Sequence, residues 1–125
     1  MRSQILKEID YFKRFYGELK PAANIFYDRE AFYDRTDSGV RLTFDSNILA
    51  RGWDLELEKG IYGERVLENG LYILEVKTAG AMPMWVAEML NEFKIYPTSF
   101  SKYGTAYKNI TTENKQMLKG ENYCA

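Results

Sequence analysis

The fold is decided by the stretch VRLTFDSNI, residues 40–48. Apolar and polar side chains alternate along its first six positions. This period of two is typical of a β-strand, in which successive side chains point to opposite faces of the sheet. Arg41, Thr43 and Asp45 are therefore expected on one face, and the apolar residues between them on the other.

Further strands are expected on both sides of this stretch. Residues 23–33 are rich in aromatic side chains and precede a Thr-Asp-Ser-Gly turn at 36–39, so 23–33 and 40–49 predict an antiparallel hairpin. Residues 71–78 predict a third strand, and a shorter strand is possible over 54–58. An antiparallel sheet with flanking helices places the chain in the α+β class.

Three helices are expected to flank the sheet. In residues 3–19 apolar side chains recur every three or four positions, which indicates an amphipathic helix. A second helix is expected over about 83–93, and a third over about 99–107 with Ser99 as its cap. The polar residues 111–125 are expected to fray.

The second helix has an apolar face of four residues, which are Val86, Met89, Leu90 and Phe93. We expect this face, together with the helix over 3–19, to cover the apolar side of the sheet. The aromatic and methionine residues elsewhere are expected to pack rather than to bind a ligand.

Composition limits the possible chemistry. The 125 residues show no shift in composition, so 1–125 is expected to form a single domain. There is no histidine and only one cysteine, Cys124, which excludes histidine-dependent nucleophilic catalysis, an internal disulfide and a thiolate zinc site. The net charge of −1 excludes the broad basic field of a nonspecific nucleic-acid binder. No apolar run approaches the roughly 20 residues of a membrane span, so a cytoplasmic location is expected.

Charged residues on the strands are candidate ligands for an anion. Tyr27 and Arg29 share a face of the first strand, Arg41 lies on the polar face of the second, and Glu75 and Lys77 share a face of the third. Such a face is usually a solvated outer surface. Alternatively, the sheet curls so that this face turns inward, where guanidinium groups match phosphate oxygens and a carboxylate holds a divalent cation. Both interpretations remain open.

The start of the third helix offers a second candidate site. Ser101 and Lys102 fall at its N-terminus, where free backbone N–H groups and the helix dipole favour an anion. The alternative is ordinary capping beside an exposed lysine.

Five strings in this order and at these separations resemble the C-terminal half of the VTC domain, a polyphosphate polymerase module of the triphosphate tunnel (CYTH-like) superfamily. They are Tyr27-Asp28-Arg29, Val40-Arg41-Leu42-Thr43-Phe44-Asp45-Ser46-Asn47-Ile48, Leu74-Glu75-Val76-Lys77, Met82-Pro83-Met84-Trp85-Val86 and Ser99-Phe100-Ser101-Lys102-Tyr103-Gly104. The resemblance implies about half of an antiparallel β barrel, in which a nucleoside triphosphate donates its γ-phosphate to inorganic polyphosphate with the help of manganese or magnesium.

The resemblance also implies roles for individual residues. By motif position, Tyr27, Arg29 and Arg41 resemble phosphate-binding residues of the tunnel wall, and Lys77 is included with them because it shares the face of Glu75. Ser101 and Lys102 resemble contacts to the phosphate chain near a tunnel mouth. Glu75 resembles the metal ligand, and the expected catalytic set is Arg29, Arg41, Glu75 and Lys102.

The complete VTC domain is about twice as long as this chain, in the upper part of the usual range for one domain. The resemblance therefore implies that the first half of the domain is a missing partner, and that the chain alone is inactive. The unpaired edges of a half barrel also favour homo-oligomers. A non-catalytic module for polyphosphate or nucleotide, or another triphosphatase of the same superfamily, remains an alternative, because a fold does not settle a reaction.

Overall fold

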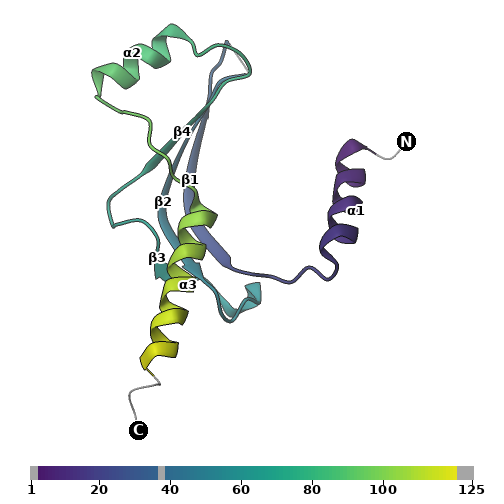
Figure 1. The fold of residues 1–125 in the computed structure, drawn as a ribbon. Coiled ribbons are helices and arrows are strands. Elements are labelled where there is room, and N and C mark those ends of the chain that lie inside the picture. Colours follow the sequence, from purple (N-terminus) through teal and green to yellow (C-terminus); the bar gives the residue numbers. More distant parts are fainter. Residues whose placement is uncertain (1–2, 37–38, 121–125) are drawn as a thin grey trace.

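The computed structural model describes residues 3–36 and 39–120 (Figure 1). Asp37 and Ser38 of the predicted turn, and residues 121–125 of the segment expected to fray, including Cys124, lie outside these ranges. The elements, in chain order, are α1 (Gln4–Tyr16), β1 (Asn24–Tyr33), β2 (Arg41–Arg51), the 3-10 helix Leu57–Lys59, β3 (Glu64–Arg65), β4 (Ile73–Lys77), α2 (Met84–Glu92) and α3 (Lys102–Gly120). The α+β class with an antiparallel sheet is confirmed.

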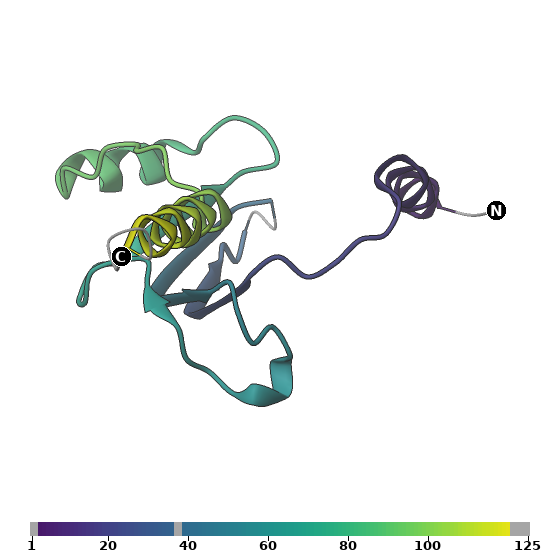
Figure 2. The ribbon, with the colours of Figure 1, turned by 60° about the horizontal axis from the view of Figure 1, so that its bottom comes forward.

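The sheet is built around β2. This strand pairs antiparallel with β1 on one side and with β4 and β3 on the other. The sheet is open in the part of the chain that the structure describes, and its strands do not close into a barrel (Figures 1 and 2). One edge is β1, and the other is formed by β4 and the two-residue β3.

A β-bulge changes the side-chain pattern of β2. Phe26 pairs with Leu49 but Asp28 pairs with Ser46, so β2 has one residue more than β1 at this point. Asn47 adopts a left-handed conformation there (φ 50°) and its amide donates to the Asp28 carboxylate over 2.7 Å. The extra residue shifts the alternation by one position. As a result, Ala50, which follows the bulge, lies on the same face of the sheet as Asp45, which precedes it. Both residues face α3.

Helix α3 lies along one face of the sheet (Figure 2). Ala106 is fully buried in this contact. A Cβ atom on Gly52 would lie 2.5 Å from Ile110 Cγ2, so glycine allows the close approach of the helix to the end of β2.

Helix α3 is longer than predicted. The helix expected over 99–107 begins at Lys102 and continues to Gly120, through most of the segment that was expected to fray.

Helix α1 stands apart from the sheet at the end of an extended segment (Figures 1 and 2). It has no buried residue, and its apolar Ile5 and Phe12 are 67% and 53% exposed. The expectation that it covers the apolar side of the sheet is wrong, because α3 packs on the sheet instead and does so on the charged side. The helix ends at Tyr16 rather than at residue 19 because Gly17 has a φ of 70°, which breaks the helix.

Helix α2 contributes less to the core than expected. Val86 is fully buried, but Met89 and Leu90 are partly buried and Phe93 is 67% exposed. The expected apolar cover by all four residues is therefore wrong, since the helix lies beyond one end of the sheet rather than across it (Figure 1).

The short strand suggested over 54–58 is also wrong. The structure has a left-handed Asp54 (φ 51°) and the 3-10 helix here, and the short strand β3 comes later. Arg51 organises this loop from a fully buried position. Its guanidinium donates to the carbonyl oxygens of Asp54, Glu56, Gly60 and Tyr62 at 2.9, 3.2, 2.7 and 3.0 Å. Such a buried cation satisfied by four carbonyls has a structural role.

Candidate functional site

The sheet register brings charged residues of three strands to one face. Arg29 of β1 pairs with Asp45 of β2, Thr43 of β2 with Glu75 of β4, and Arg41 of β2 with Lys77 of β4. Residues that are directly opposite in antiparallel strands lie on the same side of the sheet. We call this set, together with Tyr27 and Lys102, which contact it, the charged face.

Asp45 lies at the centre of the charged face and is completely buried. Its carboxylate accepts hydrogen bonds from Nε and Nη2 of Arg29 over 2.6 and 2.7 Å, which makes a bidentate pair. The ammonium of Lys102 contacts the same carboxylate from the first turn of α3. One carboxylate therefore joins β1, β2 and α3.

Tyr27 provides an aromatic surface for both cations. The Arg29 guanidinium lies 5.1 Å and the Lys102 ammonium 5.0 Å from the centre of its ring. Cation–π contacts at these distances are attractive, because the face of the ring is electronegative. The Tyr27 side chain therefore helps to hold two like charges side by side.

Glu75 lies at the β4 side of the charged face. Its carboxylate is 3.0 Å from the Lys77 ammonium and 3.7 Å from Arg29 Nη2. The hydrogen bond from Lys77 holds the pKa of Glu75 below its usual range. The Glu75 side chain is 36% exposed, so it is accessible from solvent while it is surrounded by cations.

The contact between Arg29 and Asp45 favours the ionised forms of both groups. The hydrogen bond from Arg29 lowers the pKa of Asp45, and the same bond raises the pKa of Arg29. Four cationic side chains share the charged face with two carboxylates, so positive charge is in excess.

Arg41 and Thr43 are incompletely satisfied. Among the residues the structure describes, the buried side-chain nitrogens and oxygens without a hydrogen-bond partner are Arg41 Nε and Thr43 Oγ1. Arg41 also lies directly opposite another cation, Lys77. Like charges in this arrangement are destabilising, and a buried donor without an acceptor costs free energy.

Ser101 caps α3 in the described structure. Its hydroxyl accepts a hydrogen bond from the backbone N–H of Gly104 over 3.1 Å, and its carbonyl accepts one from Thr105. The cap is therefore Ser101 rather than Ser99, because the helix begins at Lys102. The Ser101 hydroxyl is used for capping, whereas Lys102 reaches the charged face.

The described residues do not build a metal site by themselves. Within residues 3–36 and 39–120 there is no group of three or more histidine, cysteine, aspartate or glutamate side chains that could hold a metal ion. Glu75 offers a single carboxylate beside cations. It fits a divalent cation only where phosphate oxygens supply most of the ligands, as they do for magnesium bound to a nucleotide.

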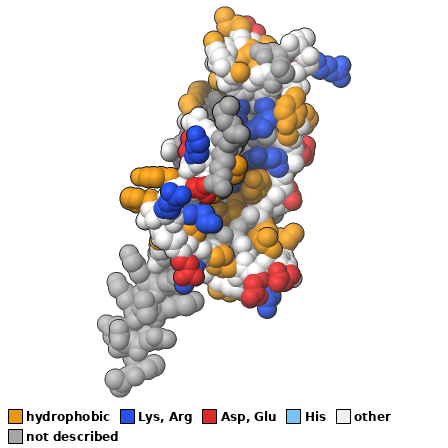
Figure 3. All heavy atoms as spheres, turned by 90° about the vertical axis from the view of Figure 1, so that its right-hand side faces the viewer, with side chains coloured by type: hydrophobic (Ala, Val, Ile, Leu, Met, Phe, Trp, Pro, Cys, Tyr) orange, Lys and Arg blue, Asp and Glu red, His pale blue; other side chains and the backbone are white. Residues whose placement is uncertain are grey.

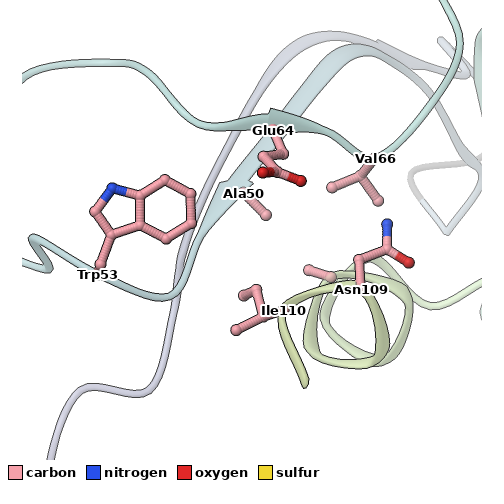
Figure 4. A pocket seen from close by; sticks show the side chains of 7 residues that line it. Ala50, Trp53, Glu64, Val66, Asn109 and Ile110 are labelled. Atoms are coloured by element: carbon pink, nitrogen blue, oxygen red, sulfur yellow. The ribbon is translucent and has the colours of Figure 1, made fainter. Parts of the chain in front are cut away.

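The cavity between α3 and the sheet does not serve as a binding site. It is lined by Ala50, Trp53, Glu64, Val66, Ala106, Asn109 and Ile110 (Figure 4). Its volume of about 10 Å³ holds one water at most.

The surface seen from the side of α1 carries no field of one sign. Basic, acidic and hydrophobic side chains are interspersed there (Figure 3). The excess of positive charge on the charged face is thus a local feature of a chain whose net charge is −1. Across residues 3–36 and 39–120, no helix has both the length and the apolar character that a membrane span requires.

Asp45 lies at the centre of the charged face, although it was not among the residues predicted to form a site. Strand alternation had put it on the same face as Arg41, and this signal was available. Its partners Arg29 and Lys102 come from elements distant in sequence, so local periodicity could not predict the pairing.

The VTC domain family matches the chain over residues 2–111. No curated protein and no solved structure matches it. The matched range covers more than half of the chain and includes every residue of the charged face. The chain therefore belongs to the VTC domain family, which is related to polyphosphate polymerases.

Proposed function

We propose that the charged face binds the phosphate groups of inorganic polyphosphate and of a nucleoside triphosphate. Arg41 carries this proposal. Its Nε is buried without an acceptor and it faces Lys77 across the β2–β4 pair, and of these two cations only Lys77 has a carboxylate close by, Glu75 at 3.0 Å, so Arg41 has an unused donor for an anion. A phosphate group offers the oxygens that both cations need.

We further propose that this face contributes to a polyphosphate polymerase. In that reaction a terminal oxygen of polyphosphate forms a bond to the γ-phosphorus, and the bond from this phosphorus to the β–γ bridging oxygen breaks, which releases the nucleoside diphosphate. Phosphoryl transfer needs mainly alignment and charge neutralisation. Arg29, Arg41 and Lys102 are the candidates for both tasks, and no histidine is required.

Glu75 is the proposed ligand for manganese or magnesium. The divalent cation would arrive with the triphosphate, whose oxygens supply the other ligands. When bound, it neutralises charge on the phosphates. The side chain of Lys77 would then exchange its ion pair with Glu75 for a phosphate contact, since Lys77 Nζ lies 3.0 Å from that carboxylate.

We also propose that this domain is the C-terminal half of a triphosphate tunnel. The open sheet and the exposed apolar side of α1 support this, because both leave surfaces without partners in the described ranges. A complementary half would cover the charged face on its open side. The inactivity of the chain alone and its cytoplasmic location remain predictions.

The binding proposal is tested by titrating the chain with sodium tripolyphosphate in a calorimeter at several salt concentrations. We expect saturable binding that weakens as salt rises. Arg41→Gln should lower the affinity about tenfold. The matched control is Arg35→Gln, which removes an exposed arginine of the β1–β2 connection. Equal loss in both variants, or no binding by the wild type, would contradict the proposal.

A non-catalytic binding module is the second candidate, because the open sheet leaves the charged face uncovered on one side. Incubation of the complete protein, which supplies both halves of the domain, with ATP and manganese separates the possibilities. Release of ADP with growth of polyphosphate indicates a polymerase, whereas release of orthophosphate without polymer indicates a triphosphatase of the same superfamily. Binding without release of either product indicates the module.

A further inference from the structure

We infer that Asp45 is a positioning residue, which sets Arg29 and Lys102 at the place where the charged face meets a polyphosphate. This inference rests on the proposed function and goes beyond it. Asp45 itself is 0% exposed, so it is not available to a ligand. A carboxylate would in any case repel a phosphate.

The geometry shows what Asp45 does to Arg29. The carboxylate occupies the Nε and Nη2 edge of the guanidinium at 2.6 and 2.7 Å. A bidentate pair fixes the plane of the guanidinium as well as its position. The Arg29 side chain remains 33% exposed, so its remaining surface is presented toward solvent in one fixed orientation.

Lys102 depends on the same carboxylate. It comes from α3, and its contact with Asp45 ties the first turn of that helix to the centre of the sheet. Two cations that converge on one point repel each other unless a negative charge lies between them. Without Asp45 the Lys102 side chain, which has many rotamers, would be held beside Arg29 only by its contact with the Tyr27 ring.

The two possible roles of Asp45 predict affinity changes of opposite sign for Asp45→Asn. If Asp45 acted only as a negative charge near an anion site, Asp45→Asn would tighten the binding of tripolyphosphate. If it is a positioning residue, the same change weakens binding although it removes a repulsive charge. The loss should be about tenfold or more, the size expected when hydrogen bonds to charged groups are disrupted.

The experiment compares Asp45→Asn with Asp28→Asn by calorimetric titration with sodium tripolyphosphate, using the full chain. Asp28 is the matched control, because it is the neighbour of Arg29 on β1 but pairs with Ser46 on the opposite face and is bonded to Asn47. We expect weaker binding only for Asp45→Asn. Unchanged or tighter binding by a folded Asp45→Asn would overturn the inference.

A double-variant comparison distinguishes positioning from a general effect on the fold. Lys102→Gln should weaken binding in the wild type but should have little further effect in Asp45→Asn, because Asp45 acts through Lys102. A merely structural Asp45 would give additive losses, which would contradict the inference. If circular dichroism shows that Asp45→Asn is unfolded, Asp45→Glu replaces it. We expect this longer side chain to lower the affinity about threefold, and unchanged affinity would overturn the inference.

The failure of this inference can be told apart from the failure of the proposed function. If the wild type does not bind tripolyphosphate, the proposed function is wrong. Amide hydrogen exchange of the ligand-free chain then still tests the positioning of Lys102, because Asp45→Asn should speed exchange in the first turn of α3 and Asp28→Asn should not. Equal exchange in the two variants would overturn the inference in that case.

Discussion

Individual residues of the charged face have distinct tasks. Asp45 is buried and serves Arg29 and Lys102, Arg41 has an unused donor, and Glu75 is reachable from solvent. A buried carboxylate among cations costs little only when every partner is present. The properties of single side chains therefore lead to two predictions.

The first prediction concerns Glu75. Glu75→Gln should weaken the binding of ATP in the presence of manganese about tenfold, because it removes the one carboxylate offered to the metal. It should leave the affinity for metal-free tripolyphosphate unchanged or higher, since a negative charge is lost from an anion site. Calorimetry with and without manganese measures both quantities.

Glu58→Gln is the control, because Glu58 is an exposed residue of the 3-10 helix. Equal affinity of wild type and Glu75→Gln for ATP with manganese would show that Glu75 is only a partner of Lys77.

The second prediction concerns the pH dependence of stability. The pKa of Asp45 is lower in the folded chain than its ordinary value, because Arg29 donates hydrogen bonds to the ionised form. Its contribution to the free energy of unfolding is therefore fully present above the ordinary value of about 3.9, and is lost as pH falls through the lower folded value. Urea denaturation between neutral pH and pH of about 3 measures this loss.

Asp45→Asn should have a flatter pH profile in the acid range, because the variant has no carboxylate to protonate at this position. Parallel profiles for the wild type and Asp45→Asn would contradict the prediction.

At the scale of elements, α3 is the helix that matters for the sheet. It packs on the charged side through Ala106 and brings Lys102 to Asp45. In α2 the buried residue is Val86, and α1 has no buried residue. The burial of a side chain in α2, rather than its size, should therefore decide how much its substitution lowers the free energy of unfolding.

The third prediction compares Val86, which lies within α2, with Phe93, which ends this helix. Val86→Ala should lower the free energy of unfolding by about 2 kcal/mol, because a fully buried side chain is shortened. Phe93→Ala removes a larger side chain but should cost less than about 1 kcal/mol, because Phe93 is 67% exposed. Urea denaturation measures both values, and a reversed order would show that α2 packs through a different face.

At the scale of the whole molecule, the described part leaves surfaces without partners. The apolar side of α1 is exposed, and β1 has an unpaired edge along its length. Exposed apolar stripes and open edges favour association. The charged residues Asp28, Arg29 and Glu30 in the middle of β1 make continuous edge pairing less favourable, so α1 is the stronger candidate.

The fourth prediction is that the chain self-associates in a concentration-dependent manner. Phe12→Glu should shift the equilibrium toward monomer, because it places a charge in the apolar stripe of α1. Arg14→Glu, on the opposite side of the same helix, should not. Sedimentation equilibrium measures the association. A wild type that is monomeric at all concentrations would contradict the prediction.

The sequence by itself determined the pattern of the sheet and the composition of its charged face. Alternation in residues 40–48 placed Arg41, Thr43 and Asp45 on one side, and the register agrees with this. These features are local, since the period of a strand depends only on neighbouring residues. The resemblance to the VTC domain was also visible in short strings, and the family match covers them.

Only the tertiary structure decided which elements cover the sheet and how the charges pair. It placed α3 rather than α1 on the sheet, put this helix on the charged side, and made Asp45 the common partner of Arg29 and Lys102. The bulge at Asn47 also shifted the alternation in the second half of β2. These features depend on contacts between residues far apart in sequence, whose free energies are decided by packing and desolvation in the assembled fold and not by local periodicity.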